Sequence, residues 1–271
     1  MSSRERADTA LVSRGFFPSR EKAQAAIMAG QVYSGGRRIQ KPSEALNPED
    51  ELTVRRPAVD YVSRGALKLE KAVRVFDADL RDRVVLDIGA STGGFTDVCL
   101  RNGARKVYAV DVGYGQLDWK LRNDPRVTVM ERTNARYLKE ESFPERPGIT
   151  VMDVSFISIT LILPVVFSVL GEVGRLISLI KPQFEAGRDK IGKHGIVSKP
   201  SAHIEVLRRV VDFAPTLGWR VRALDFSPIA GGSGNLEFLA DFVPAPRCDR
   251  FISPDDIAAL VKHAHAAVPL K

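Results

Sequence analysis

Two lysines and two acids stand near the expected ends of strands and helices, where side chains can exchange protons with a ligand. Asp153 and Lys181 each follow a short apolar run, Lys68 lies in an expected helix, and Glu237 lies in the last expected strand. Open α/β sheets bind ligands outside the carboxyl ends of their strands, so Asp153 and Lys181 should face one. Alone, each residue is more often part of a structural ion pair. Together they predict a proton-transfer site with a lysine as base.

A glycine-rich turn follows the apolar run at 84–88 and predicts a nucleotide-like ligand. Its glycines are Gly89, Gly93 and Gly94. They allow a tight backbone path from a buried parallel strand into a helix beginning near Phe95. A dinucleotide-binding turn needs a glycine where Ser91 stands, and a phosphate-binding loop needs a lysine where Phe95 stands. The ligand is therefore expected to lack phosphates.

A second apolar run, 106–111, ends in Asp111, which is placed to accept hydrogen bonds from ribose hydroxyls. With the glycine turn and Asp87, this pattern fits S-adenosylmethionine in a class I methyltransferase, and a glycine turn with surface acids is the alternative. The residues predicted to contact the cofactor are Asp87, Gly89, Ser91, Gly93, Gly94, Phe95, Asp111, Val112 and Asp153.

Methyl transfer to a ribose 2′-hydroxyl would use the four ionisable groups. This reaction needs in-line geometry and the removal of a weakly acidic proton. Lys181 is the expected base if partial burial and a second cation at Lys68 lower its pKa enough to leave it partly neutral. Asp153 and Glu237 would then orient the lysines and balance their charge.

Oxygen is the methyl acceptor that remains after two alternatives are weighed. Enzymes that methylate exocyclic base nitrogens usually carry an Asn/Asp-Pro-Pro-Tyr/Phe clamp after the fourth strand, but residues 153–156 read Asp-Val-Ser-Phe. Enzymes that methylate carbon 5 of pyrimidines need a nucleophilic cysteine. Cys99 and Cys248 lie outside the motifs expected to hold one.

Strand-like and helix-like segments alternate beyond residue 62, which predicts a doubly wound α/β sheet. Strands are expected at 84–88, 106–111, 127–130, 149–153, 175–180, 219–226 and 236–243. The loop between the last two has no room for a helix, so an antiparallel hairpin should end the sheet. Ser63 is placed to cap a helix that runs through Phe76, and 157–170 is expected to be a buried helix that Pro164 interrupts.

Residues 1–57 look like a separate small α+β module. Two short helices, the second capped by Ser19, precede a hairpin around 34–36 and a strand at 52–54. A linker is expected at 58–61, a methyltransferase domain at 62–245 and a helical tail at 246–271. The predicted RNA contacts are basic residues: Arg6, Arg14, Arg20, Lys22, Arg37, Arg38, Lys41 and Arg64. A solvated basic surface is the alternative that composition alone leaves open.

Composition fits a globular protein with a polyanionic partner. The 271 residues are 44% hydrophobic and 27% charged, with a net charge of +7. Two cysteines exclude a disulfide framework, and the four histidines show no metal-ligand spacing, so no metal is expected. The start of the chain lacks an apolar signal region and no apolar run is long enough to span a membrane, which predicts a cytoplasmic protein.

Several motifs lie along the second part of the chain: YVSRG at 61–65, KLE at 68–70, DIGASTGGFTD at 87–97, AVDVGYGQL at 109–117, DVSFIS at 153–158, IKPQFE at 180–185 and GNLE at 234–237. Together they closely resemble the TlyA, or hemolysin A, family, whose members join an S4 domain to an FtsJ/RrmJ-like methyltransferase domain. The order of residues 6–32 resembles an S4 RNA-binding domain, although Ser34-Gly35-Gly36 departs from its usual Val-Asn-Gly turn.

This resemblance implies S-adenosylmethionine-dependent 2′-O-methylation of ribosomal RNA, with cytidines of both subunits as the best-known targets and rRNA or ribosomal subunits as partners. It also implies that the family's Lys-Asp-Lys-Glu tetrad corresponds to Lys68, Asp153, Lys181 and Glu237. It further implies that Asn134, which follows the run 127–130, contacts the adenine of the cofactor, although an ordinary turn asparagine could stand there too. Two alternatives stay open: an RNA-binding ribosome-assembly factor with an inactive methyltransferase fold, and a membrane-active hemolysin. The target nucleotide and the oligomeric state are not predicted.

Overall fold

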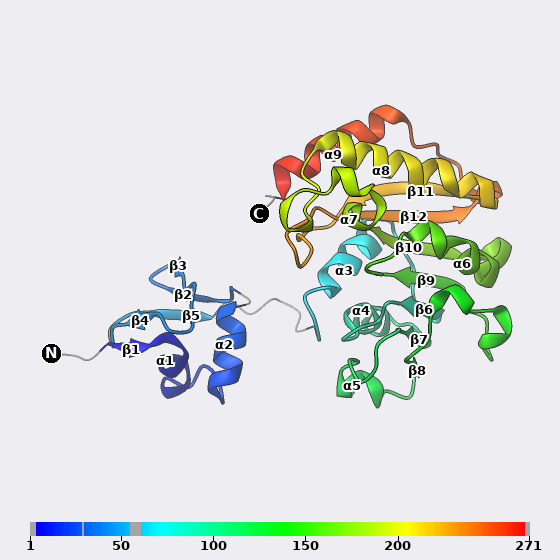
Figure 1. Ribbon diagram of the computed structural model, residues 1–271. Coiled ribbons are helices and arrows are strands. Elements are labelled where there is room, and N and C mark those ends of the chain that lie inside the picture. The colour runs from blue at the N-terminus through cyan, green and yellow to red at the C-terminus, as the bar shows by residue number, and fades with distance from the viewer. Residues whose placement is uncertain (1–3, 29, 55–60, 269–271) are drawn as a thin grey trace. The chain divides into compact units, whose positions relative to one another are not determined.

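The structure is a computed structural model that describes residues 4–28, 30–54 and 61–268. The chain divides into two compact units, Met1–Asp60 and Tyr61–Lys271 (Figure 1). The linker predicted at 58–61 lies outside the described residues, apart from Tyr61. Each unit has its own core and is described by itself.

The first unit is a small α+β fold with the helix pair and hairpin that the sequence predicts. Its helices are α1 (Ala7–Ser13) and α2 (Arg20–Met28). Strand β2 (Val32–Ser34) pairs antiparallel with β3 (Arg37–Arg38) and β5 (Leu52–Val54), and β1 (Glu5–Arg6) pairs with β4 (Ala45–Leu46). Apolar side chains of both helices, including Leu11 and Ile27, pack on Val32 and Ile39.

A buried carboxylate organises the helix pair of this unit. Asp8 is fully buried and accepts hydrogen bonds from Arg6 at 3.0 Å, Arg20 at 3.0 Å and Gln24 at 2.8 Å. Arg6 contributes most to holding the pKa of Asp8 well below its usual range, against the effect of burial. Arg20 and Gln24 therefore join α2 to α1 through Asp8, whereas Arg6 holds the start of α1, and both arginines are also predicted to contact RNA.

The second unit is built on a seven-stranded sheet in the order β11-β12-β10-β9-β6-β7-β8. Neighbouring strands from β10 to β8 run parallel, and β12 runs antiparallel to both β10 and β11. The predicted terminal hairpin is therefore present at one edge. The strands are β6 (Val84–Ile88), β7 (Lys106–Val110), β8 (Val127–Met130), β9 (Ile149–Met152), β10 (Arg175–Ile180), β11 (Trp219–Phe226) and β12 (Phe238–Pro244).

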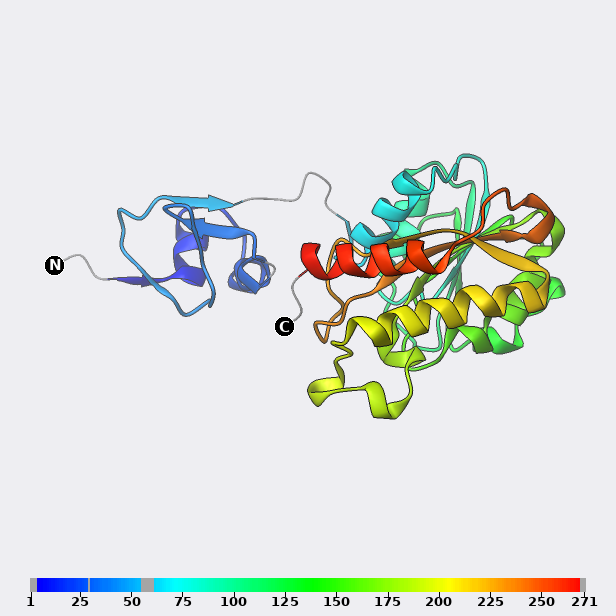
Figure 2. The same cartoon turned by 90° about the horizontal axis from the view of Figure 1, so that it is seen from above.

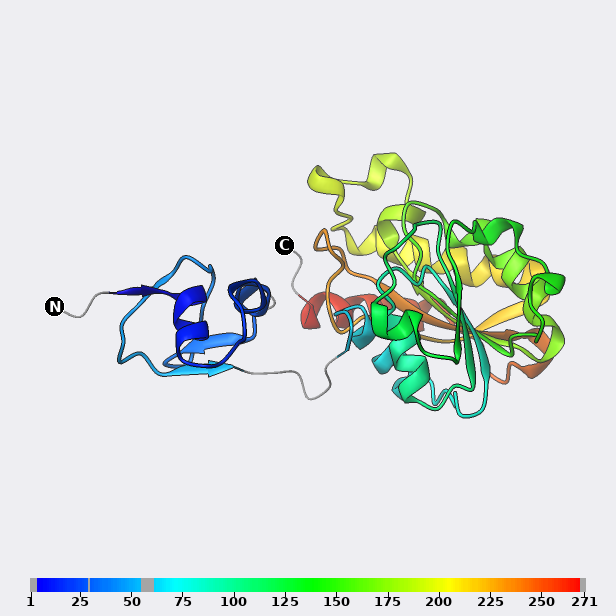
Figure 3. The ribbon, with the colours of Figure 1, turned by 90° about the horizontal axis from the view of Figure 1, so that it is seen from below.

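Helices cover both faces of this sheet, as Figures 2 and 3 show. Side chains alternate across β6: Leu86 joins the core beneath α6, α8 and α9, whereas Val85 joins the core beneath α3 and α4. The helices are α3 (Ala66–Val75), α4 (Gly94–Arg101), α5 (Trp119–Arg122), α6 (Leu163–Leu170), α7 (Pro182–Glu185), α8 (Pro200–Phe213) and α9 (Pro254–Ala267).

Two helix starts differ from the prediction. Helix α3 begins at Ala66 rather than after Ser63, and Gly65 is its N-cap without a side-chain hydrogen bond. Ser63 is instead packed so closely on Gly94 that a Cβ there would lie 2.3 Å from its Oγ. Helix α6 begins at Leu163, so Pro164 lies in its first turn, where proline is tolerated, rather than interrupting it.

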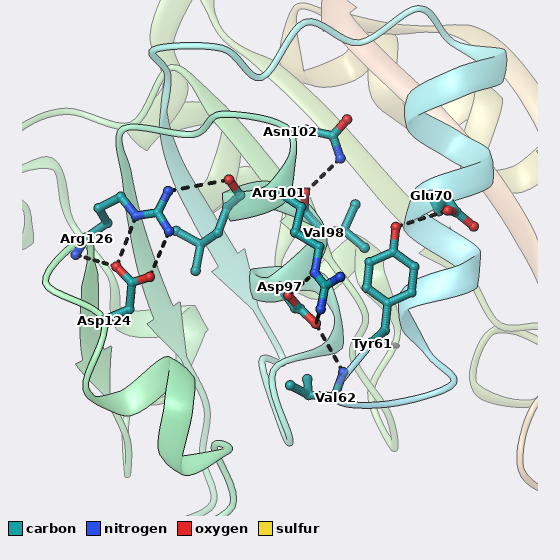
Figure 4. A network of polar contacts seen from close by, with 10 residues as sticks. Tyr61, Val62, Glu70, Asp97, Val98, Arg101, Asn102, Asp124 and Arg126 are labelled. Atoms are coloured by element: carbon teal, nitrogen blue, oxygen red, sulfur yellow. Dashed lines mark hydrogen bonds and ion pairs between the residues drawn. The ribbon is translucent and has the colours of Figure 1, made fainter. Parts of the chain in front are cut away.

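The segment that leads into α3 is fastened to α4 by polar contacts (Figure 4). The backbone N–H of Val62 donates to Asp97 at 3.1 Å, and the Tyr61 hydroxyl donates to Glu70 at 3.0 Å. Arg101 lies over the Tyr61 ring, 4.9 Å from its centroid. Burial and the Glu70 carboxylate raise the pKa of Tyr61 to about 12, so this hydroxyl stays a donor. These contacts fix the start of α3, the helix that carries Lys68.

In the described part of the chain, the structure has neither a group of side chains that could bind a metal ion nor a helix that could span a membrane. His203 of α8 and His265 of α9 form a side-chain hydrogen bond at 2.9 Å, which joins the two helices. Within the described ranges, His, Cys, Asp and Glu form no group that could hold a metal ion. Among these same residues, every helix is too short or too polar to cross a membrane.

Replacing Asp8 by alanine should loosen the first unit, because Arg6 and Arg20 would lose their buried anchor. We expect the opening free energy of α1 to fall by about 2 kcal/mol, less than for a fully buried pair because both arginines are half-exposed. Hydrogen exchange of α1 amides in the full chain measures it. Since the pKa of Asp8 is lowered on folding, the stability that its carboxylate contributes to the first unit is present above pH ~4 and lost below it. Glu49→Ala, at an exposed site, is the control.

Candidate active site

The four predicted ionisable side chains meet at the carboxyl edge of the parallel strands. Lys68 Nζ lies 2.6 Å from Glu237 Oε2 and 3.7 Å from Asp153 Oδ2, and Lys181 Nζ lies 2.6 Å from Asp153 Oδ1. Lys68 comes from α3, Asp153 follows β9, Lys181 follows β10, and Glu237 precedes β12. Opposite charges therefore alternate along one chain of contacts, from Glu237 through Lys68 and Asp153 to Lys181.

Electrostatics keep Lys68 protonated. Burial by itself would lower the pKa of Lys68, but the carboxylates of Asp153 and Glu237 outweigh burial and raise that pKa. Asp153 stands between the two lysines and contacts both. Lys181 also donates a hydrogen bond to the Ser155 hydroxyl at 2.9 Å. Lys68 thus supplies a fixed positive charge, and Lys181 contacts both Asp153 and Ser155.

A cavity of about 820 Å³, within the range of small-molecule sites, opens beside Asp153. Asp153 is the one residue of the four that is in its wall, and Lys181 adjoins the wall through Asp153 and Ser155. Loops at the carboxyl ends of successive parallel strands line it. Six predicted cofactor contacts are in its wall: Gly89, Ser91, Asp111, Val112, Asn134 and Asp153. Asp111 accepts hydrogen bonds from the backbone N–H of Ser91 at 2.8 Å and of Gly113 at 2.7 Å, so it also shapes the wall.

The other four predicted cofactor residues lie behind the wall: Asp87, Gly93, Gly94 and Phe95. Gly93 has φ +96°, and a Cβ there would meet Leu121 of α5 at 2.2 Å. Asp87 is fully buried and accepts a hydrogen bond from the Thr96 hydroxyl at 2.6 Å. Burial, reinforced by the Asp153 charge, raises the pKa of Asp87 to about 7. These residues support the turn from within.

Several lining residues had no predicted role. Ser155 and Phe156 belong to the DVSFIS motif and Phe184 to the IKPQFE motif, so the sequence marks them as candidate site residues. Their position in the wall, however, depends on how the loops fold. Phe156 has a left-handed φ of +65° and is 91% exposed, which is unusual for a bulky residue. Gln116, Thr133 and Arg136 are further polar residues of the wall that had no predicted role.

The predicted RNA-contacting residues fall into two groups. Arg14 donates to the backbone carbonyls of Asp50 at 2.7 Å and Asn47 at 2.9 Å, so it holds the fold of the first unit, as Arg6 and Arg20 do. The others have exposed side chains, and of these Arg37 also forms an ion pair with Glu44. This second group consists of Lys22, Arg37, Arg38 and Lys41 in the first unit and Arg64 in the second.

The site fits S-adenosylmethionine. Gly89 has φ +83°, and a Cβ there would lie 2.3 Å from the Asp153 carbonyl oxygen, so the loop needs glycine beside the ionisable chain. The Asp111 carboxylate stands at the end of β7, where a ribose is bound in such sheets. An α/β unit with this turn, this acid and a terminal antiparallel hairpin is a class I methyltransferase.

Comparisons with known proteins agree. Residues 61–242 match the FtsJ-like methyltransferase family, and residues 5–52 match the S4 domain. The chain is 52% identical to "Putative rRNA methyltransferase YqxC" of Bacillus subtilis and 44% identical to "16S/23S rRNA (cytidine-2'-O)-methyltransferase TlyA" of Mycobacterium tuberculosis. Each alignment covers 88% of this chain, with 85% and 89% of the relative.

A solved structure, "Putative hemolysin from Streptococcus thermophilus", matches 98% of both chains with a TM-score of 0.77 and 47% identity. The chain belongs to the TlyA family of FtsJ-like methyltransferases that carry an S4 domain. The predicted fold class, the family resemblance and S-adenosylmethionine as cofactor are thereby confirmed.

Replacing Gly89 by alanine should reduce cofactor affinity at least tenfold, because the new Cβ would displace the Asp153 carbonyl and strain the left-handed turn. Calorimetric titration with S-adenosylmethionine measures this. Gly218→Ala is a matched control, since Gly218 has φ +74° at the opposite edge of the sheet with open space around its Cβ position. Equal affinity in both variants would show that the close approach at Gly89 is unimportant.

Replacing Asp87 by asparagine should stabilise the ligand-free protein at neutral pH. The wild-type carboxyl has a folded pKa of about 7 against roughly 3.9 when unfolded, so the folded state holds an extra proton between these values. Wild-type stability therefore falls relative to the variant as pH rises from 4 to 7, by a few kcal/mol at most. Urea unfolding across this range measures the difference. Asp255→Asn, at an exposed site, should show no such trend.

Proposed function

We propose that this chain transfers a methyl group to the 2′-hydroxyl of a ribose in ribosomal RNA, with a cytidine as the target nucleoside. The observation that carries the proposal is the chain of contacts from Glu237 through Lys68 and Asp153 to Lys181 beside the cavity. The name of the 44% identical relative, a 16S/23S rRNA (cytidine-2'-O)-methyltransferase, supports the substrate. An rRNA or ribosomal-subunit partner also accounts for the S4 domain and the net charge of +7, and implies a cytoplasmic location.

Each ionisable residue has a distinct role in this proposal. S-adenosylmethionine supplies an electrophilic methyl group. Lys181 Nζ is the proposed general base that takes the proton from the 2′-hydroxyl, and Asp153 then holds the ammonium that results. Lys68, kept positive by its two carboxylate partners, balances Asp153, and Glu237 orients Lys68 at 2.6 Å. The positioning of these groups should supply much of the rate acceleration.

Cofactor and RNA are proposed to be held by different residues. The wall residues Gly89, Ser91, Asp111, Val112 and Asn134 would hold the cofactor, with Asp87, Gly93, Gly94 and Phe95 supporting the turn behind them. The exposed basic residues, together with the outward faces of Arg6 and Arg20, would contact phosphates. The exposed group consists of Lys22, Arg37, Arg38, Lys41 and Arg64.

Replacing Lys181 by alanine should lower kcat for methyl transfer about 10²- to 10⁴-fold, the usual contribution of a general base, while cofactor affinity changes little. The measurement uses rRNA or ribosomal subunits with methyl-labelled S-adenosylmethionine. Alkali should leave intact the phosphodiester bond that follows the labelled nucleotide, which shows that the methyl group is on its 2′-oxygen.

The matched control is Lys262→Ala, at an exposed lysine of α9. It should methylate RNA at the wild-type rate. A methyl group found only on bases, or full activity of the Lys181→Ala protein, would contradict the proposed function.

A further inference from the structure

Glu185 lies at the end of a one-turn helix that begins directly after Lys181, and the proton-transfer scheme leaves it without a role. Helix α7 has Pro182 in its first turn and is closed by two backbone hydrogen bonds. Phe184 N–H donates to the Lys181 carbonyl at 2.9 Å, and Ala186 N–H donates to the Pro182 carbonyl at 2.8 Å. Because one short rigid turn joins them, Glu185 and Lys181 hold a fixed relation.

The Glu185 carboxylate reaches across to the loop that follows the neighbouring strand, β9. It is 7% exposed and accepts hydrogen bonds from the Ser158 hydroxyl at 2.6 Å and the Ile159 backbone N–H at 2.7 Å. Arg209 of α8 donates to the Glu185 backbone carbonyl at 2.8 Å. A buried carboxylate is costly unless its oxygens are hydrogen-bonded. The Glu185 carboxylate meets that condition, and its hydrogen bonds join α7 to the loop that follows β9.

The loop held in this way carries Ser155, which contacts Lys181, and Phe156, which packs on Phe184 of α7. Ser155 accepts a hydrogen bond from Lys181 Nζ at 2.9 Å, and Phe156 adopts its left-handed φ of +65° with its ring 5.1 Å from that of Phe184. A strained, exposed aromatic residue keeps one conformation only when its surroundings determine it. At the start of the loop, Asp153 N–H donates to the Ile88 carbonyl at 2.9 Å. Glu185 fixes the other end.

We infer that Glu185 is a positioning residue: it anchors the loop at 154–158 so that Ser155 keeps its place beside Lys181 and Phe156 its place against Phe184. Glu185 does not touch the reacting atoms in this scheme. It acts through the loop and through the helical turn shared with Lys181. The catalytic consequence rests on the proposed function, whereas the anchoring of the loop does not.

Glu185→Ala should lower kcat/KM for RNA at least tenfold, mainly through kcat, because Lys181 loses its defined hydroxyl partner. Glu185→Gln should stay within about threefold of wild type, since its amide oxygen can accept from Ile159 N–H and its NH₂ can donate to the Ser158 hydroxyl. Glu172→Ala is the control, because it removes an exposed glutamate outside the cavity wall. Wild-type kcat and KM in Glu185→Ala would overturn the inference.

Hydrogen exchange of the 154–162 backbone provides a readout that needs no activity. Exchange should be at least tenfold faster in Glu185→Ala than in Glu185→Gln or wild type, with the thermal unfolding midpoint little changed. If Glu185→Ala does not fold, Ser158→Ala removes one of the two bonds and should show a smaller acceleration in the same segment. Unchanged exchange there would overturn the anchoring role. Absence of 2′-O-methylation by wild type would contradict the proposed function alone.

Discussion

The Asp153 carboxylate between two lysines is the interaction on which the rest of the site depends. Its oxygens contact Lys181 at 2.6 Å and Lys68 at 3.7 Å, and the Lys68 ammonium in turn contacts Glu237. Removing charged groups from water is costly unless each finds a partner in good geometry. The alternation of signs meets that cost for all four groups at once, so the loss of one leaves a neighbour uncompensated.

The register of the sheet brings these groups to one place. Met152 pairs with Ile88 on one side and Ser178 on the other, so Asp153 emerges beside the glycine turn and near the end of β10. Ile180 pairs with Phe238 of the antiparallel strand, which sets Lys181 and Glu237 at the same edge. A slip of one residue in either pairing would turn these side chains to the opposite face. The terminal hairpin is therefore a working part of the site.

Several polar residues of this protein serve support rather than contact. Asp87 is buried behind the cavity wall at the cost of a raised pKa, and Asp8 holds Arg6 and Arg20 inside the first unit. The proposed role of Glu185 is of the same kind. Asp8 and Glu185 are buried carboxylates whose hydrogen-bond donors lie on neighbouring helices or loops, whereas Asp87 accepts from the Thr96 hydroxyl at one oxygen and leaves Oδ1 without a partner.

The amino-acid sequence was sufficient to predict the strands, the terminal hairpin, the glycine turn and the four ionisable residues of the site. Apolar runs and glycines determine structure locally, and Asp153 and Lys181 adjoin strand ends. Position along the chain could not show that Asp87 and Asp111 have different roles, one in the interior and one in the cavity wall. Both stand at strand ends, yet Asp87 lies within β6 and points into the interior, whereas Asp111 stands one residue beyond β7 in the cavity wall. The sequence predicted Ser63 as a helix cap, whereas in the structure its side chain packs against Gly94. Only the tertiary structure decided these matters, because the direction of a side chain depends on neighbours that are distant in the sequence.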